Sequence, residues 1–534
     1  MVVEGSYMKS INSFMKNQTA EMSLAILLIL ITIADRMHNI GKMGLWPDEV
    51  FTASLAYPDH TLYTVIKGAL STPIPAPPLI YVVSHIWMKI VGFDDVLIRI
   101  PFVIAGAMGI PAIYLAGRSL FSKRVGIVSA TLLFFSSMHI FHSREARYYP
   151  FLFLFSTLSI FFLNQAINFE DKKWWAGYVI FSILNIYTFH TALFVLAAQG
   201  IYILYLALTD ILSYQKRSLK SWGESPLGKY TLSLIIIFLF YLPLLPYLLG
   251  GLNSSRGYTS QDLSGRFTAD FFIKGLIPNF FGTPDTPINI FLIFFAAGLF
   301  LYIRKNYHQT IYIIIISIFP FIVLQQISIR HWVEYKYFMF ILPLFLIVIA
   351  QGIENAASLF SHISKTDNIS VPLWENMLSI LFLIVVLSVN SRYYGRGFVQ
   401  YNSLWREQGA FVNQVMGPGD LFVTFKISSN RTIHTKEMFS IYFDPINNPQ
   451  EIIPIVGDSD GLANYLEQFD HVFFHHGPIE PKFLEDIYEW IDQTVHIKMK
   501  FGNYSIFYIG KNTSRNELLD NLRDYKKFID HDDY

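Results

Sequence analysis

Residues 150–168 read PFLFLFSTLSIFFLNQAIN, nineteen residues without one charged side chain. As an α-helix, a stretch of this length crosses the hydrocarbon core of a membrane, which is about 30 Å thick. Core helices of soluble proteins are shorter or keep a polar face. The stretch therefore predicts a transmembrane helix.

Further apolar segments of about 17–22 residues, the length of a membrane crossing, occur along the chain. They lie at 22–38, 98–117, 125–141, 174–190, 192–209, 230–249, 287–303, 310–327, 337–353 and 373–390. The whole chain is 53% hydrophobic and 15% charged, whereas soluble domains have about 25% charged residues. We therefore predict a polytopic α-helical membrane protein with about eleven transmembrane helices, whose surroundings are the lipid bilayer.

The formal net charge is zero, so no overall field points to a nucleic-acid partner, and we expect none. The chain has no cysteine, which excludes disulfides, thiolate metal ligands and a cysteine nucleophile. Any chemistry has to come from the other polar side chains near the ends of the apolar segments.

Basic residues collect in short loops that follow every second predicted crossing. They are Arg118, Lys123 and Arg124; Lys172 and Lys173; Lys216, Arg217, Lys220 and Lys229; and Arg304 and Lys305. Because lysine and arginine are enriched in cytoplasmic loops, we predict a cytoplasmic N-terminus and an extracytoplasmic C-terminal region in the cell (plasma) membrane. An even number of crossings would reverse the second inference. The apolar segment 79–91 is the open case, because it is either a short surface helix or a true span.

Composition divides the chain into three predicted parts. Residues 1–390 hold the apolar segments, with a first outer loop at 39–97; residues 391–510 form a small soluble α/β domain; and residues 511–534 form a charged tail, expected to be partly disordered. The predicted strands of the α/β domain are 421–425, 438–443, 471–475, 496–500 and 505–509, with a hairpin turn at Gly502-Asn503. Its predicted helices are 404–415, 461–469 and 481–491.

Two adjacent acids, Asp48 and Glu49, follow the first apolar segment in the sequence Trp46-Pro47-Asp48-Glu49. On the predicted outer face, they are candidates for a general base that deprotonates an acceptor hydroxyl, or for metal ligands. The alternative is an ordinary solvated acidic pair.

A second polar cluster, HSREARYYP at 142–150, lies at the outer end of the segment 125–141. Its candidate residues are Arg144, Glu145, Arg147, Tyr148 and Tyr149. Arginine suits a bidentate contact with a phosphate. The alternatives are snorkelling for the arginines and interfacial anchoring for the tyrosines.

A third cluster, RHWVEYKY at 330–337, lies between the segments 310–327 and 337–353. Arg330 and Lys336 are candidates for a phosphate contact, His331 for proton transfer or a metal, and Glu334 for the wall of a pocket. A structural histidine is the alternative. All three clusters fall on one face of the membrane in the predicted topology. We therefore predict one extracytoplasmic site for an amphiphile with an anionic head and a long apolar tail.

These stretches, in this order, resemble the GT-C membrane glycosyltransferases, in the branch of the dolichyl-phosphate-mannose–protein mannosyltransferases and the lipid A aminoarabinose transferase. The similar stretches span about residues 20–350 and are Arg36, Leu45 to Glu49, Pro77 to Tyr81, Arg99 to Pro101, Gly117 to Phe121, Ser143 to Pro150, and Arg330 with Tyr335 to Tyr337 and Pro343. The chain departs from the family at Ala76, where His or Lys is frequent, and at Tyr149-Pro150, where some members have Asp.

The resemblance implies an inverting transferase that moves a sugar from a polyprenyl-phosphate donor to an extracytoplasmic lipid, glycan or protein. It implies that Asp48 is the catalytic base, with Glu49 beside it and Glu145 as a second acid. The acceptor attacks the anomeric carbon as polyprenyl phosphate departs, and the protein mainly positions these groups and neutralises the developing charge. The resemblance implies no particular organic cofactor, and a divalent metal held by Asp48, Glu145 and His331 stays open.

Two other functions fit a many-span chain with cationic loops. One is a transporter or flippase for a lipid-linked sugar, which often shows repeated halves and broken helices near the midplane. The other is a non-catalytic assembly subunit that uses the α/β domain as a binding module. The absence of a sequence repeat and the position of the polar clusters in outer loops favour the enzyme.

Overall fold

The computed structural model describes residues 21–529 with internal gaps. The residues outside the description are 1–20, 24, 43, 72–75, 170, 213–224, 254–279, 281–288, 304–306, 328–334, 364–370, 392–404, 418–419, 426–452, 456–468, 477–490, 492–495, 502–503, 511–512, 523–528 and 530–534. Four predicted elements lie in these gaps. They are the strand 438–443, the helices 461–469 and 481–491 for all but the last residue of each, and the turn at 502–503.

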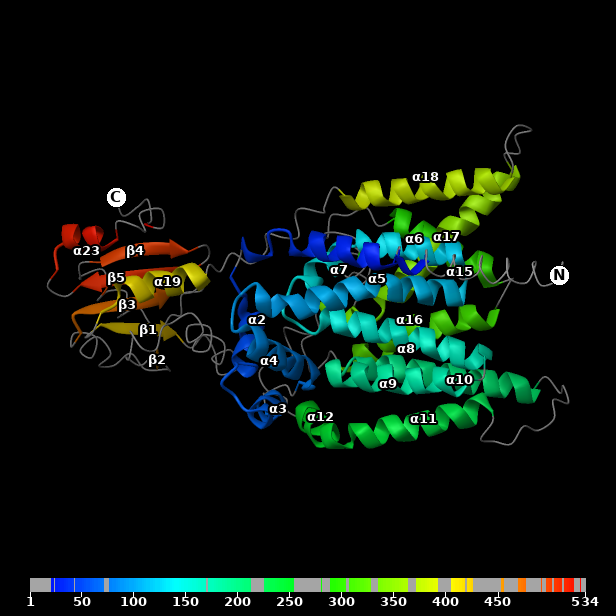
Figure 1. The fold of residues 1–534 in the computed structure, drawn as a ribbon, viewed down its shortest axis with the longest axis horizontal. Coiled ribbons are helices and arrows are strands. Elements are labelled where there is room, and N and C mark those ends of the chain that lie inside the picture. Colours follow the sequence, from blue (N-terminus) through cyan, green and yellow to red (C-terminus); the bar gives the residue numbers. More distant parts are fainter. Residues whose placement is uncertain are drawn as a thin grey trace, which may run out of the picture. The chain divides into compact units, whose positions relative to one another are not determined.

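The chain forms two compact units (Figure 1). The helical unit comprises residues 1–38, 61–83 and 99–398, and the mixed unit comprises residues 39–60, 84–98 and 399–534. Residues of the first predicted outer loop thus group with the C-terminal part of the chain. The predicted domain boundaries at 390 and 510 stay a prediction.

Each predicted apolar segment contains helix in the part of the chain that the structure describes. The helices are α5(Ile100–Leu120), α6(Lys123–Phe134), α7(Ser137–Ser143), α8(Tyr149–Phe169), α9(Lys172–Thr188), α10(Ala192–Leu212), α11(Pro226–Tyr241), α12(Leu245–Asn253), α15(Asn289–Ile303), α16(Tyr307–Ile327), α17(Leu342–Ile363) and α18(Val371–Ser391), preceded by the span Glu21–Lys42. Short helices α3(Leu62–Leu70) and α4(Leu79–Val91) lie between the first two segments. The polytopic helical fold is therefore confirmed.

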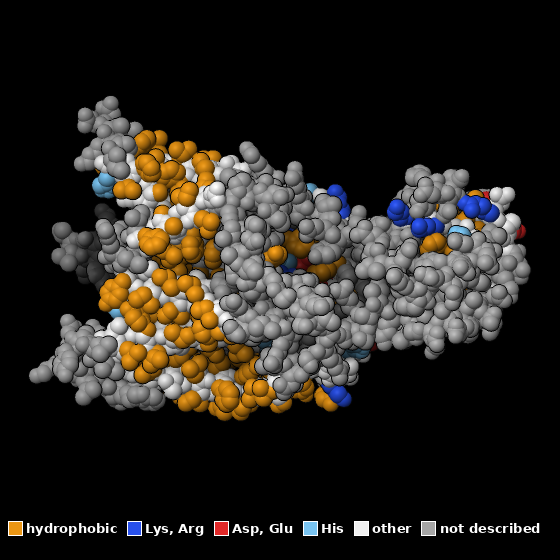
Figure 2. All heavy atoms as spheres, turned by 180° about the vertical axis from the view of Figure 1, so that it is seen from behind, with side chains coloured by type: hydrophobic (Ala, Val, Ile, Leu, Met, Phe, Trp, Pro, Cys, Tyr) orange, Lys and Arg blue, Asp and Glu red, His pale blue; other side chains and the backbone are white. Residues whose placement is uncertain are grey.

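Seven helices of the described residues are long and apolar enough to cross a membrane, or eight if one bent pair counts as a span. Helix α4 is shorter than a span, and the total of eleven crossings stays a prediction. In the apolar stretch of α8, 72% is buried within the structure, whereas in that of α18 only 11% is buried. Helix α8 is therefore central in the unit and α18 is peripheral. Figure 2 shows hydrophobic side chains gathered in a broad band over the outside of this unit, as expected for a lipid-facing surface.

The predicted segment 125–141 is not one continuous helix, which corrects the sequence-based expectation. Helices α6 and α7 meet at an angle of 62°, and Ser136 caps the N-terminus of α7. The Ser136 hydroxyl donates to the carbonyl of Phe280 at 3.0 Å. Arg36, which is fully buried and paired with Asp35, donates to the carbonyl of Phe134 at 2.8 Å. These contacts satisfy polar groups that a helix break leaves without intrahelical partners.

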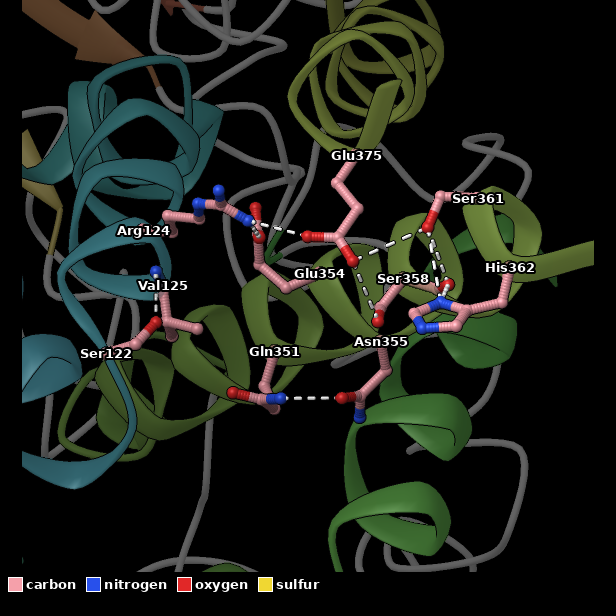
Figure 3. Close-up of polar contacts among 10 residues, drawn as sticks. All are labelled: Ser122, Arg124, Val125, Gln351, Glu354, Asn355, Ser358, Ser361, His362 and Glu375. Atoms are coloured by element: carbon pink, nitrogen blue, oxygen red, sulfur yellow. Dashed lines mark hydrogen bonds and ion pairs between the residues drawn. The ribbon is translucent and has the colours of Figure 1, made fainter. Parts of the chain in front are cut away.

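Polar side chains attach the peripheral helix α18 to its neighbours (Figure 3). The Arg124 guanidinium of α6 lies 3.1 Å from the carboxylate of Glu375 in α18, and 4.0 Å from that of Glu354 in α17. The hydroxyl groups of Ser358 and Ser361 in α17 donate to Glu375 at 3.2 and 3.4 Å. A helix that buries little apolar surface is thus held partly by charge-assisted hydrogen bonds.

The backbones of helices α15 and α17 approach so closely at two glycines that no side chain fits between them. A Cβ atom on Gly352 would lie 1.8 Å from the Phe294 carbonyl oxygen, and one on Gly298 would lie 2.1 Å from that of Val348. Small residues allow such close approach between membrane helices.

We expect Gly352→Ala to lower the free energy of unfolding by about 1–3 kcal/mol, because the new methyl group has to push two helix backbones apart. Thermal unfolding of the protein in detergent measures the effect. Gly250→Ala in α12 is the matched control, since nothing lies within 4 Å of a Cβ there. An equal loss in both variants would contradict the close packing of α15 on α17.

The mixed unit contains a five-stranded sheet with the order β2-β1-β3-β5-β4. The strands are β1(Leu421–Phe425), β2(Ile453–Ile455), β3(His471–His476), β4(His496–Phe501) and β5(Tyr504–Gly510). Strand β1 pairs in parallel with β2 and β3, whereas β5 pairs antiparallel with β3 and β4. Four of these strands were predicted, and the predicted β4–β5 pairing is confirmed. The three-residue strand β2 was missed, because its sequence Ile-Pro-Ile contains a proline, which argues against a strand.

Two helices of the mixed unit flank the sheet, α19(Trp405–Val415) and α23(Arg515–Asn521). Phe411 of α19 contacts Phe473 of β3, with ring centroids 5.9 Å apart, and both side chains are fully buried. Arg406 of α19 donates to the carbonyl of Gly41 at 3.1 Å and lies 3.8 Å from Asp95. These contacts explain why residues of the first predicted outer loop group with this unit.

Candidate functional site

The two acids of the first predicted loop have different environments within the mixed unit. Helix α2(Pro47–Leu55) begins at Pro47, and Glu49 lies in its first turn. The Glu49 carboxylate is fully buried and accepts the backbone N–H of Trp46 at 3.2 Å, which is how an acid caps a helix N-terminus. Asp48, beside it, is half-buried. Glu49 therefore caps the N-terminus of α2, and Asp48 is the more accessible of the two acids.

In the helical unit, the stretch between α7 and α8 brings an acid and a histidine together. His142 Nδ1 lies 2.9 Å from Glu145 Oε2, and the two residues are 8% and 6% exposed. The Glu145 carbonyl also accepts the backbone N–H of Arg147 at 2.8 Å, which shapes the turn into α8. Arg144 is half-buried at the C-terminus of α7. The predicted second cluster is thus a folded turn rather than a solvated loop.

The two tyrosines of this turn are buried among aromatic rings. Tyr148 stacks on Phe189, with centroids 4.0 Å apart and an interplanar angle of 13°, and it lies 4.4 Å from Tyr149. The ring of Tyr149 lies 4.5 Å from that of His142. The guanidinium of Arg147 lies 5.1 Å from the Tyr148 ring centroid, a cation–π distance.

The third predicted cluster contributes to the same place. The short helix η6(Tyr335–Phe338) carries Lys336, whose Nζ lies 5.9 Å from the ring centroid of Tyr149. Tyr337 of the same helix lies 5.6 Å from Phe189. Two stretches almost two hundred residues apart therefore meet in one cation–aromatic cluster, formed by Arg147, Tyr148, Tyr149, Phe189, Lys336 and Tyr337. Arg330, His331 and Glu334 lie outside the described residues.

The environment of Tyr148 keeps its phenol neutral. Burial raises the pKa of Tyr148 well above its usual value, as do Tyr149 and Tyr337, whereas Arg147 and Lys336 oppose the increase. A neutral phenol remains a hydrogen-bond donor, and the two cations supply positive charge beside it. The cluster can therefore receive an anionic group such as a phosphate.

The described residues contain no group of three or more His, Cys, Asp or Glu side chains arranged to hold a metal ion. The predicted ligand His331 falls in a gap, so the metal set of Asp48, Glu145 and His331 stays a prediction. In the part of the site that is described, one oxygen of Glu145 faces His142.

The sequence-based reasoning missed three participants. His142 was quoted in the second cluster but was given no role, although its spacing of three residues from Glu145 is that of neighbours on a helix. Tyr337 was quoted in the third cluster but was likewise given no role. Phe189 gives no local signal, because its ring contacts are with Tyr148 and Tyr337, which are distant in the sequence.

The mixed unit has a polar pocket of its own, of about 330 Å³. Its lining residues are Gln414, Val415, Gly417, Asp420, Asp470, His471, Tyr508 and Asn521. Asp420 accepts the backbone N–H of Gly417 at 2.7 Å and lies 2.9 Å from His471 Nδ1. This hydrogen bond from His471 to Asp420 raises the pKa of His471 above its usual value.

Because the pKa of His471 is higher in the folded protein than in the unfolded chain, its contribution to the free energy of unfolding falls as the pH rises. Below the pKa of the unfolded chain, about 6.5 for histidine, the His471–Asp420 contact contributes fully; it is lost as pH rises through the higher folded pKa. We therefore expect amide hydrogen exchange of β3 and β5, corrected for intrinsic rates, to show lower stability of the mixed unit at alkaline pH. Asp420→Asn should weaken this dependence, and an unchanged dependence would contradict the assignment.

The fold of this chain is that of the GT-C membrane glycosyltransferases. Residues 75–247 match the family described as dolichyl-phosphate-mannose-protein mannosyltransferase. The structure is similar to that of ArnT from Cupriavidus metallidurans in the apo state, with a TM-score of 0.53, 12% identity, and coverage of 92% of this chain and 98% of that one. The resemblance expected from the sequence motifs is confirmed.

Two further solved structures show the same likeness. ArnT from Cupriavidus metallidurans bound to undecaprenyl phosphate matches with a TM-score of 0.53, 12% identity, and coverage of 91% of this chain and 98% of that one. The Archaeoglobus fulgidus oligosaccharyltransferase matches in its apo form with a TM-score of 0.52, 12% identity, and coverage of 92% and 74%. No curated protein matches the sequence significantly.

Proposed function

We propose that the chain is a glycosyltransferase that moves a sugar from a polyprenyl-phosphate donor to an acceptor lipid, glycan or protein. The observation that carries the proposal is the cation–aromatic cluster, in which Arg147 and Lys336 lie over buried tyrosines beside apolar helices. An anionic headgroup suits the cations, and a polyprenyl chain suits the lipid-facing surface. The similar ArnT structure contains undecaprenyl phosphate, and a dolichol phosphate is present in an Archaeoglobus fulgidus oligosaccharyltransferase structure.

The proposed reaction needs a base and charge neutralisation. Asp48 takes the proton of the acceptor nucleophile, which forms a bond to the anomeric carbon as the bond from that carbon to the phosphate oxygen breaks. The electron pair of the broken bond stays on the departing polyprenyl phosphate. Arg147 and Lys336 neutralise its charge, with Arg144 and Arg330 as further candidates and Tyr148 as a neutral hydrogen-bond donor. Attack opposite the leaving group inverts the anomeric centre.

The proposal places the site and the C-terminal region outside the cytoplasm, because of the basic loops predicted inside. The chain has no cysteine, so single introduced cysteines report sidedness without background. We expect Asn516→Cys, exposed in α23, to react with a membrane-impermeant maleimide in intact cells. Lys172→Cys, exposed at the start of α9, should react only after permeabilisation. The reverse pattern would overturn the proposed sidedness.

The decisive test of function is mass spectrometry of products. The purified protein is incubated with extracted polyprenyl-phosphate sugars and cell-envelope acceptors, and we expect a sugar-bearing acceptor together with free polyprenyl phosphate. A flippase would instead move the intact donor across a vesicle membrane, and an assembly subunit would leave both donor and acceptor unchanged. Either result would replace the proposal.

A further inference from the structure

Arg406, in the first turn of α19, contacts two separate stretches of the first predicted outer loop. Its Nη1 donates to the Gly41 carbonyl at 3.1 Å and lies 3.8 Å from a carboxylate oxygen of Asp95. We propose that Arg406 is a positioning residue, which holds the loop that carries Asp48 against the α/β part of the mixed unit. The inference rests on the proposed glycosyltransferase function, in which Asp48 is the base, and it gives the C-terminal part of the chain a task in the reaction.

The first of the two stretches leads directly to Asp48. The 3-10 helix η1(Ile40–Lys42) has only three residues and follows Asn39, whose φ of 56° lies in the left-handed region. Helix α2 begins at Pro47, four residues after η1, and Asp48 lies in its first turn. A connection this short limits how far Asp48 can move relative to η1. A contact that fixes Gly41 therefore also restrains Asp48.

The second stretch is a closed turn. The Asp94 carboxylate accepts the backbone N–H groups of Val96 and Leu97 at 2.8 and 2.9 Å, as an aspartate does when it stabilises a turn. Asp95 lies in this turn and is 8% exposed. The backbone at Gly41 packs on the same turn, because a Cβ atom there would lie 2.8 Å from Cγ2 of Val96. The guanidinium thus contacts two segments that also contact each other.

Helix α19 is fixed at its other contacts. Phe411 and Val412 are fully buried, and the Phe411 ring lies 5.9 Å from that of Phe473 in the sheet. Arg406 therefore extends from a helix that is packed on the sheet to a loop that is not part of the sheet. Its two contacts with the loop transfer the position of the sheet to the start of α2.

The size of the expected effect follows from the exposure of the arginine. The Arg406 side chain is 39% exposed, so its ion pair with Asp95 is weakened by solvent and adds little to overall stability. Orientation is more sensitive, because a misplacement of about 1 Å of a reacting group costs about a hundredfold in rate. We expect the loss of this one clamp to lower turnover about three- to tenfold, since other contacts of the loop remain.

The test compares Arg406→Met, Arg406→Lys and Arg515→Met in the full-length protein. Methionine keeps an unbranched apolar stem but removes both polar contacts, whereas lysine keeps the charge and a donor for the Gly41 carbonyl. We expect Arg406→Met to lower turnover, with unchanged affinity for polyprenyl phosphate, and Arg406→Lys to recover part of the loss. Arg515, exposed in the first turn of α23, is the matched control, and Arg515→Met should keep the wild-type rate.

A double variant separates positioning from general damage to the fold. If Arg406 acts through Asp48, Arg406→Met should lower turnover much less in the Asp48→Asn background than in the wild type, because the group that it positions is already lost. A factor that is the same in both backgrounds would overturn the inference.

A second measurement does not depend on activity. The chain has no cysteine, so spin labels can be attached at Lys42→Cys beside Gly41 and at Lys500→Cys in β4, both exposed positions of the mixed unit. We expect the distance distribution from pulsed electron paramagnetic resonance to broaden with Arg406→Met and to stay narrow with Arg515→Met. An equally narrow distribution in both would overturn the inference, whether or not the protein transfers sugar. Broadening with Arg406→Met in a protein that transfers no sugar would overturn only the proposed function.

Discussion

Asp48→Asn is expected to lower the rate of sugar transfer by about a hundred- to ten-thousandfold, the usual contribution of a general base. Asparagine has nearly the same shape but cannot accept a proton from the acceptor. Asp48 is half-buried in the first turn of α2, and its replacement leaves the cap made by Glu49 in place. The fold should therefore persist, as judged by thermal unfolding, while turnover measured by product mass spectrometry falls.

The same stretch of the mixed unit offers a matched control. Asp59 is an exposed acid, so Asp59→Asn removes the same charge without touching the proposed base. It should keep near-normal turnover. Near-normal turnover in both variants would remove Asp48 from the mechanism. An equal loss of turnover in both would indicate a general effect of charge.

Glu49 needs a different pair of substitutions. Glu49→Gln retains an oxygen that can accept the Trp46 N–H, whereas Glu49→Ala loses the cap. A helix cap contributes typically about 1 kcal/mol. If Glu49 acts only as the cap, the alanine variant is less stable than the glutamine variant, and the rate per folded molecule is similar in both.

The helices were predictable from sequence because a membrane span needs only local information. Long apolar stretches, such as residues 150–168, have one stable arrangement in a bilayer, since helices satisfy their own backbone hydrogen bonds. The same rule failed at 125–141. There the polar groups around the bend have partners on Arg36 and Phe280, which are distant in the sequence. Hydropathy cannot detect partners of that kind.

In the candidate site, too, local features were predictable from the sequence and tertiary contacts were not. The acid pair at 48–49, the turn at 142–150 and the cationic stretch at 330–337 were recognisable as polar interruptions between apolar segments. That Lys336 lies over Tyr149, and that Phe189 stacks on Tyr148, follows from tertiary packing and has no local signature. The spacing of the adjacent acids does not distinguish Asp48 from Glu49, and only the resemblance to the family implies Asp48 as the base. The structure adds that Glu49 is buried and accepts the Trp46 N–H.

The cation–aromatic cluster leads to the second large effect. A charge-assisted contact with a phosphate contributes roughly 1.5–3 kcal/mol, which corresponds to about ten- to a hundredfold in affinity. We expect Arg147→Ala and Lys336→Ala each to weaken polyprenyl-phosphate binding by that factor, whatever sugar the carrier bears. Arg147→Lys should recover only part of the loss, because lysine cannot make the planar bidentate contact of a guanidinium.

A lysine in a similar local setting separates phosphate binding from general effects of charge. Lys173 lies over the Trp174 ring at 5.3 Å, much as Lys336 lies over Tyr149 at 5.9 Å, but it pairs with Asp171 in a predicted cytoplasmic loop. Lys173→Ala should therefore leave the affinity unchanged. Binding of polyprenyl phosphate to the purified variants, measured at two ionic strengths, distinguishes the cases, since an exposed charge is screened by salt more than a partly buried one. If Lys336→Ala binds as well as Lys173→Ala, Lys336 only anchors η6 against Tyr149, and if Arg147→Ala also binds normally, the carrier phosphate lies elsewhere.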